Sequence, residues 1–418
     1  MNSSDWRPRF TNEAFFADPY AIYDALREAT PIFWSGEFYG GGWILTRYED
    51  VEAMLRDPRF SARRTGRWIT GLGSDAKNEL QDFQRLFSRA MLFLDAPDHQ
   101  RMREVLNAGF RGEVMGHARS LIASQVEELI DGIDSRNAFD FVERVARPLP
   151  ALVIAGMMGV DARDMNDFIA WSNDLAEFIG APKPTMAQAR RARASLLAMS
   201  RYFEGRIAQW DSPANNLVDH LVVASRDGRI AGGTEVLAQC AMLLFAGHET
   251  SRHFLANSLY HLLAYSEIWE LLREEPRRVS AAVRELLRFD SPVQYTARRL
   301  AVDMSLHGQD CRRGDLVIGL IGSANRDPRR YQNPQRLDIS RKPGQLLAFG
   351  SGPHVCIGAG LALAEGEIVI NSVLRQWPGL RLAQTGTVWN RNPVYRGLSE
   401  LMVIQSPTDH AHSNVQAR

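Results

Sequence analysis

The sequence predicts a mainly α fold with a small β-rich part. From Asp98 onward, apolar residues recur at helical spacing through most of the chain. The longest such segment covers residues 233–264, which is long enough to cross a whole domain. Strand-like segments are short and lie near the N-terminus and in the last third of the chain. Together these observations favour a helical body that carries a minor sheet.

The N-terminal part mixes both element types. Asp18 and Pro19 precede an amphipathic pattern, which predicts a capped helix with proline at its first position. Residues 31–34 and 43–46 read as two strands around a glycine-rich turn, and residues 48–56 read as a short helix. Residues 57–95 show no regular pattern, so we expect a functional or mobile loop there.

The remaining elements follow from periodicity and breaker residues. The stretch 180–184, GAPKP, interrupts the helical series and predicts a flexible connection. Thr234 is the expected cap of the long helix, with Glu235 in its first turn. The pattern predicts helices at 98–109, 113–133, 148–158, 162–178, 186–210, 215–225, 233–264, 266–275, 278–289 and 359–376, strands at 293–302 and 315–319, and a final hairpin of 380–383 with 394–404.

Composition narrows the class of protein. The 418 residues are 45% hydrophobic and 23% charged, with zero formal net charge, so no overall field favours nucleic acid. Three distant cysteines argue against a disulfide framework and favour the cytoplasm. No signal peptide or membrane anchor is evident. We expect a single domain over 1–418, with 1–17 as an N-terminal extension and 406–418 as a disordered tail.

The segment 349–358, FGSGPHVCIG, carries the strongest chemical signal. Its glycines and proline force a tight bend that delivers Cys356 to the start of the next helix. There the helix dipole should ease ionisation and make the thiol a good soft-metal ligand. A lone cysteine is more often a structural core residue, and Cys240 and Cys311 are interpreted in that way. For Cys356, in contrast, the three glycines and the neighbouring His354 favour a role in a binding site.

This segment resembles the haem-thiolate signature of the cytochrome P450 family. The resemblance extends from about Asp18 to Val403 and implies a bacterial member with the cytochrome P450 fold. In that fold, haem lies between the long central helix and the helix that follows the cysteine loop. Cys356 would then be the axial iron ligand. Phe349 would pack against the sulfur side of the haem.

The middle of the long helix, AGHET at 246–250, forms a second candidate site. Gly247 costs about 1 kcal/mol inside a helix, so either close helix packing or room for a ligand should compensate. Thr250 can bond back to a carbonyl one turn earlier, and it would stand beside the Glu249 carboxylate. The segment resembles the oxygen-binding groove of the family. The resemblance implies that Gly247 clears space beside haem, and that Glu249 and Thr250 deliver protons to dioxygen.

Glu285 and Arg288 share one helix face at i, i+3. Such a pair on a surface contributes well under about 1 kcal/mol. The family resemblance implies a buried network instead, which holds the segment before the cysteine loop and which Arg326 or Arg330 joins.

A set of cationic residues is the fourth candidate. His99 and Arg103 lie at i, i+4 on one helix, where a solvated basic face is the plain alternative. By resemblance to bacterial members, they bind the haem propionates together with Arg298 and His354, and Arg299 is the near competitor of Arg298.

The resemblance also outlines a substrate pocket. The implied lining residues are mainly apolar, although each one could equally be ordinary core. They are Phe93, Phe178, Leu243, Ala246, Val293, Tyr295 and Tyr395. The arginines within 60–95 leave an anionic or carboxylated substrate open.

The function implied by the resemblance is that of a soluble monooxygenase with haem b as cofactor. It would use O2 to hydroxylate or epoxidise a small, mainly apolar organic molecule in secondary metabolism or catabolism. Electrons would come from a ferredoxin and an NAD(P)H-dependent ferredoxin reductase, docked near Arg101, Arg111 and Arg341. Non-hydroxylating oxidation (C–C coupling, decarboxylation or peroxygenation) is one alternative, and a non-enzymatic haem sensor is another.

Overall fold

The computed structural model describes residues 8–64, 72–209, 216–342, 344–383 and 387–406. Two predicted segments extend beyond this range: residues 1–7 of the N-terminal extension and residues 407–418 of the tail lie outside the described residues. The helices are α1 (Glu13–Ala17), α2 (Pro19–Ala29), α3 (Tyr48–Arg56), α5 (Ser74–Glu79), α6 (Gln81–Phe87), α7 (Asp98–Ala108), α8 (Gly112–Asp131), α9 (Pro148–Met157), α10 (Met165–Gly180), α11 (Met186–Ala208), α12 (Leu217–Arg226), α13 (Gly233–Ala264), α14 (Ser266–Glu274), α15 (Val279–Phe289), α16 (Ile321–Ala324) and α17 (Ala359–Gln376).

The strands form one larger sheet and several small ones. They are β1 (Ile32–Ser35), β2 (Gly42–Leu45), β3 (Phe60–Ser61), β4 (Phe139–Asp140), β5 (Thr296–Leu300), β6 (Met304–Leu306), β7 (Gln309–Cys311), β8 (Leu316–Gly319), β9 (Leu380–Leu382), β10 (Val388–Trp389), β11 (Leu398–Glu400) and β12 (Met402–Gln405). The larger sheet has the order β1-β2-β8-β5-β3. Strands β2 and β8 pair in parallel, which joins the two strand-rich parts of the sequence into one unit.

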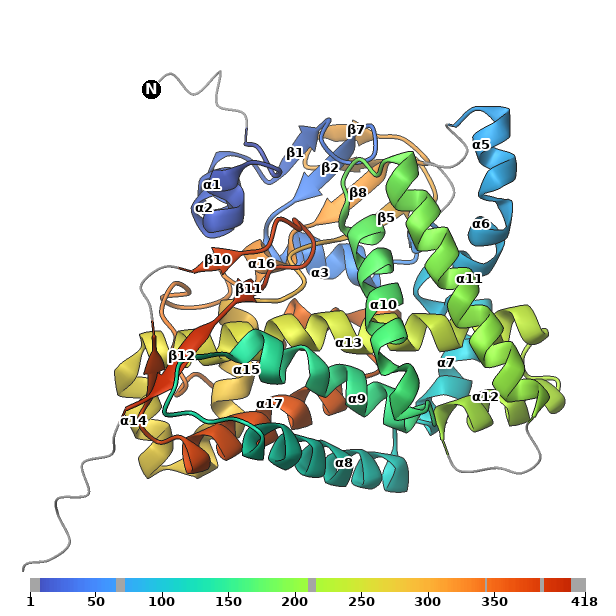
Figure 1. The fold of residues 1–418 in the computed structure, drawn as a ribbon. Coiled ribbons are helices and arrows are strands. Elements are labelled where there is room, and N and C mark those ends of the chain that lie inside the picture. Colours follow the sequence, from blue (N-terminus) through green and yellow to red (C-terminus); the bar gives the residue numbers. More distant parts are fainter. Residues whose placement is uncertain (1–7, 65–71, 210–215, 343, 384–386, 407–418) are drawn as a thin grey trace, which may run out of the picture.

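Figure 1 shows the helices as the main body, with the sheet of β1, β2, β8 and β5 at one side. Helix α13 runs through this body, and α9, α8 and α17 lie roughly along it, while α10 and α11 cross it. Most of α13 is buried on every face, so its stability rests on packing and not on an amphipathic stripe. The mainly α prediction with a small β-rich part is therefore confirmed.

Helix α17 approaches α13 unusually closely. A Cβ placed on Gly366 of α17 would lie 2.7 Å from the ring of Phe254, which belongs to α13. Gly366 is thus required for this contact, since any side chain there would push the two helices apart. The contact matters for the site because the cysteine loop leads directly into α17.

Several local predictions need correction. Thr234 does not cap α13; the N-cap is Gly232, whose φ of 137° suits only glycine, and the Glu235 carboxylate accepts the Ala231 N–H at 2.8 Å. The 57–95 stretch is not a plain loop, because it contains α5 and α6.

The chain ends also pack differently from the prediction. The extension predicted for 1–17 contributes α1 and buries Phe10 and Phe15 in the core. In the predicted hairpin, 380–382 pairs with 402–405, whereas 398–400 pairs with 388–389. Among the described residues, no helix is long and apolar enough to cross a membrane.

Candidate functional site

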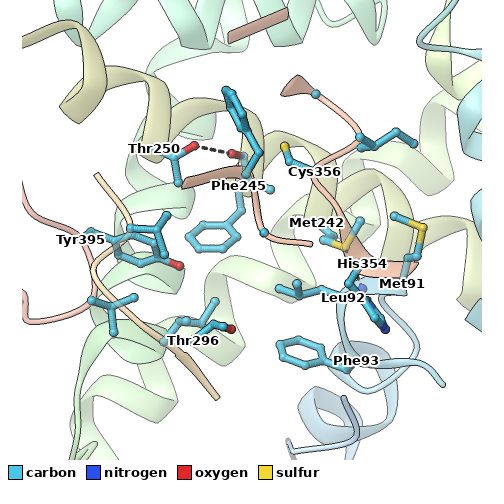
Figure 2. A pocket seen from close by; sticks show the side chains of 18 of the residues that line it. Met91, Leu92, Phe93, Met242, Phe245, Thr250, Thr296, His354, Cys356 and Tyr395 are labelled. Atoms are coloured by element: carbon cyan, nitrogen blue, oxygen red, sulfur yellow. Dashed lines mark hydrogen bonds between the residues drawn. The ribbon is translucent and has the colours of Figure 1, made fainter. Parts of the chain in front are cut away.

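A cavity of about 400 Å³ lies between the middle of α13 and the loop that precedes α17. Its walls are mainly apolar and also come from the 91–93 turn, the end of α10, the start of β5 and the segment around Tyr395. Figure 2 shows Cys356 and His354 on one side of this space, with Phe245 and Thr250 projecting from α13. Its size is that of a small-molecule or cofactor site.

The cysteine loop is shaped by its glycines. Gly350 and Gly352 adopt φ values of 74° and 70°, which other residues rarely adopt. The Cys356 N–H donates to the Phe349 carbonyl at 2.8 Å, closing the bend. Gly358 lies close to the sulfur, since a Cβ at this position would be in ordinary van der Waals contact with Cys356 Sγ, at 4.0 Å. The thiol thereby faces the cavity.

The protein alone does not favour the thiolate at Cys356. Burial raises the pKa of its thiol, and the Gly358 N–H and Arg103 only partly oppose that effect. By its accessible surface, however, Cys356 is exposed, and α17 begins three residues later, at Ala359, so easy ionisation at the helix start stays a prediction. A coordinated metal ion would deprotonate the thiol.

The four predicted cationic residues do come together at one end of the cavity. The rings of His99 and His354 have centroids 3.9 Å apart. Burial and then Arg298 lower the pKa of His354 to about 3, and burial lowers the pKa of Arg298 to about 9. Arg103 donates to the Val355 carbonyl at 2.6 Å. The lowered pKa values of His99 and His354 keep both rings neutral at neutral pH, so Arg103 and Arg298 carry the positive charge of this cluster and favour an anionic partner.

The two residues predicted to act as a pair on α13 are separated by the structure. Thr250 lines the cavity and its Oγ1 donates to the Ala246 carbonyl at 3.0 Å. Glu249 is buried away from the cavity lining, where it binds His253 at 3.0 Å and Arg252 at 3.3 Å. Burial raises the pKa of Glu249, but these two partners outweigh burial and hold it well below its usual range. The two side chains are therefore not side by side on one wall.

Gly247 serves both purposes that the sequence left open. It lines the cavity. In addition, a Cβ at this position would lie 3.1 Å from Ile154 of α9, so the glycine also permits close helix packing.

The Glu285–Arg288 pair is buried and bidentate, with both hydrogen bonds at 2.8 Å. Arg288 also donates to the carbonyls of Asn325, Pro334 and Arg336. One guanidinium therefore ties α15 to the long segment that leads toward the cysteine loop.

The third cation of this network differs from the prediction. Arg341 binds the Glu285 carboxylate at 3.3 Å. Arg326 instead donates to the Phe289 carbonyl at 2.6 Å, and Arg330 lies over the Tyr48 ring. Of the residues predicted to form the docking patch, Arg341 is engaged in this network and Arg101 forms an ion pair with Glu235 at 2.7 Å, and the patch itself stays a prediction.

The pocket residues predicted from the sequence all line the cavity. They are Phe93, Phe178, Leu243, Ala246, Val293, Tyr295 and Tyr395. The prediction missed Arg64, Tyr39 and Phe245, which also contribute to the walls. Only the arginine-rich character of 60–95 hinted at Arg64.

A thiol and a cationic cluster that border one mainly apolar cavity are the groups expected around an anionic, metal-containing cofactor. Comparisons with known proteins agree. The family model for cytochrome P450 matches residues 44–383, and the chain belongs to this family.

Relatives and solved structures cover nearly the whole chain. The biotin biosynthesis cytochrome P450 of Bacillus subtilis is 32% identical over 93% of this chain and 96% of its own length. The epothilone C/D epoxidase of Sorangium cellulosum is 30% identical over 97% and 98%. The crystal structure of P450BioI in complex with hexadec-9Z-enoic acid ligated acyl carrier protein superposes with a TM-score of 0.86, at 31% identity, covering 94% of this chain and 100% of that one. The chain is thus a bacterial-type cytochrome P450 and an oxidoreductase.

The residues present fit the haem-thiolate cofactor that the family implies. The thiol faces the cavity, glycines border it, and His99 Nε2 is buried without a hydrogen-bond partner at the cationic end. An iron porphyrin with two carboxylates matches this set of donors.

Proposed function

We propose that this chain is a monooxygenase that uses haem b and dioxygen to hydroxylate or epoxidise a small, mainly apolar organic substrate. The observation that carries the proposal is the arrangement of Cys356 and Thr250 around one apolar cavity. Relatives named as an epoxidase and as a biosynthetic cytochrome P450 support it. Ferredoxin and an NAD(P)H-dependent ferredoxin reductase are the proposed electron donors, and the cytoplasm is the proposed location.

In this proposal the chain binds the cofactor from two directions. Cys356 would supply the sulfur that binds the iron, and Phe349 and Gly247 would border the cofactor. Arg103 and Arg298 would form ion pairs with the propionates, and His99 and His354 would add hydrogen bonds. Haem bound through a thiolate supplies the oxidising chemistry that the amino acids lack.

Proton delivery falls to α13. We propose that Thr250 Oγ1 holds and passes the proton, because it is the hydroxyl of the AGHET segment that faces the cavity. Arg252 and His253 hold Glu249 as a carboxylate, so it would have to leave these partners and take up a proton from solvent before it could pass one to Thr250.

Replacing Cys356 with alanine tests the core of the proposal. The reduced carbon monoxide complex of the wild type should show the absorbance of a thiolate-bound haem, and the Cys356→Ala variant should lack it. Cys311→Ala is the matched control, since Cys311 is buried far from the cavity lining. A thiolate spectrum that persists in Cys356→Ala would contradict the assignment.

Thr250→Ala tests the proton path. The variant should consume NAD(P)H at a rate similar to the wild type but release hydrogen peroxide or water, with product yield lowered at least about tenfold. Thr250→Ser keeps the hydroxyl and should retain most of the coupling. Full coupling in Thr250→Ala would remove Thr250 from the mechanism.

A further inference from the structure

The charged side chains of the cavity wall are cationic. Within the described residues, the lining contains four arginines and neither aspartate nor glutamate. The four are Arg64, Arg103, Arg298 and Arg299. Arg298 is buried and the other three are partly buried, and cations withdrawn from water without anionic partners are costly, so the contents of this cavity should bring negative charge.

Three of these arginines already have partners or an assigned place. Arg103 binds the Val355 carbonyl beside Cys356. Arg298 stands next to the pair of His99 and His354 and donates to the Ala297 carbonyl at 2.9 Å. Arg299 donates to the Gly314 carbonyl at 2.8 Å. The two haem propionates of the proposed function suffice for the cluster around Arg298.

Arg64 is different because it comes from the segment after β3 and binds weakly. Its hydrogen bonds go to the carbonyls of Ala62 and Leu92, at 3.2 and 3.4 Å, and its guanidinium lies 4.8 Å from the centre of the Phe93 ring. The carboxylate that interacts with the charge of Arg64 is that of Asp95. Asp95 already accepts hydrogen bonds from the Ser61 hydroxyl and the Ala62 N–H. Among the described residues, Arg64 thus uses only Nη1 for hydrogen bonds to protein groups, which leaves its Nε and Nη2 donors for a ligand.

The surroundings of Arg64 point to the substrate space. Tyr39 and Tyr395 are the groups that interact with its charge most strongly. Tyr395 forms a backbone bridge with Val293, and both residues line the cavity. Burial lowers the pKa of Arg64 to about 10, so its side chain is charged at neutral pH. The charge thus lies between the cationic cluster and the tyrosine-lined wall.

We propose that Arg64 binds the carboxylate of an amphipathic, monocarboxylic substrate whose apolar body lies along Phe93, Phe178 and Val293. This inference rests on the proposed function and narrows its substrate to a carboxylic acid. A planar fork of donors suits a carboxylate, and the apolar walls suit a hydrocarbon body. The neighbouring aromatic ring of Phe93 holds the guanidinium in place.

The test uses the haem-loaded full chain and the shift of the ferric absorbance on binding. Dodecanoic and tetradecanoic acids are titrated beside the primary alcohols of equal length, in the wild type, Arg64→Gln and Arg64→Lys. We expect the wild type to bind the acids at least about tenfold more tightly than the alcohols. Arg64→Gln should lose this preference while its affinity for the alcohols stays within about twofold, and Arg64→Lys should be intermediate.

Arg63→Gln is the matched control, because Arg63 is exposed and faces Asp95 and Asp98. It should keep the preference for acids. Equal affinity for acids and alcohols in the wild type, or equal weakening of both in Arg64→Gln, would overturn the proposal.

Two further outcomes separate the possible errors. If Arg64 holds a propionate instead, Arg64→Gln will lose haem faster to apomyoglobin while its acid preference stays unchanged, which overturns the proposal. If the wild type shows no thiolate spectrum, the proposed function fails and this inference fails with it. A thiolate spectrum without acid preference overturns this inference alone.

Discussion

The region around the Glu285–Arg288 pair and the cavity wall around Phe93 and Phe178 are built in opposite ways. In the first region, one buried guanidinium binds a carboxylate and three backbone carbonyls from distant segments. In the second, aromatic side chains from separate segments meet mainly through ring contacts. Hydrogen bonds fix one geometry, whereas ring packing accepts several side chains of similar volume. The first region therefore supports the cofactor, and the second can vary with substrate.

The largest expected effect follows from breaking the polar region. Arg288→Ala removes the bidentate donor of the Glu285 carboxylate, which keeps Arg341 and the Asp338 N–H, and it leaves three carbonyls without this donor; the loss should cost about 3–5 kcal/mol. We expect little folded protein and almost no haem incorporation, measured by soluble yield and by the ratio of haem to protein absorbance.

Arg284→Ala is the control on the same helix, since Arg284 is exposed. Its haem content and melting temperature should match the wild type. A stable, haem-loaded Arg288→Ala protein would show that the network does not carry the fold.

Replacing Glu365 should have a smaller effect on stability, and it should stabilise the protein where Arg288→Ala destabilises it. This α17 side chain is fully buried and faces Ser251 of α13. Within the described part of the chain, neither of its carboxylate oxygens has a hydrogen-bond partner. Burial raises its pKa to about 8. Since the folded pKa lies above the unfolded value, its contribution to stability is complete below about pH 4 and is lost as pH rises toward 8.

Glu365→Gln should therefore stabilise the protein at pH 8, by about 1–3 kcal/mol, and leave it nearly unchanged at pH 5. Thermal melts at both pH values check this difference. A stabilisation of equal size at the two pH values would exclude ionisation as its cause.

The smallest effect on folding should come from the aromatic wall. Phe178 is only half-buried, so Phe178→Ala should lower stability by about 1–2 kcal/mol, less than a fully buried phenylalanine would. Its effect on ligands should be larger, because the ring forms part of the cavity wall. Titration with imidazole and 4-phenylimidazole should show a shift in preference toward the larger ligand. An unchanged ratio of the two affinities would mean that Phe178 does not limit the cavity.

The contrast between the hydrogen-bonded region and the aromatic wall also bears on which features could be predicted from the sequence. Cys356, Glu285 and Arg288 stand in short motifs that resemble those of the family, and this resemblance assigned their roles, whereas the helices were predicted from periodicity. The orientation of Glu249 depends on His253, one turn further on, and the motif does not encode that choice. The roles of Arg64 and Arg341 depend on which distant segments fold against them, so local patterns could not assign them.

The contact between Gly366 and Phe254 has a consequence for the shape of the site. Phe254 also lines the cavity, and Gly366 lies on the helix that follows Cys356. A side chain at position 366 would have to displace the Phe254 ring, and the wall of the cavity would change with it. The packing of two helices, behind the wall, thus helps to set the shape of the space in front of it.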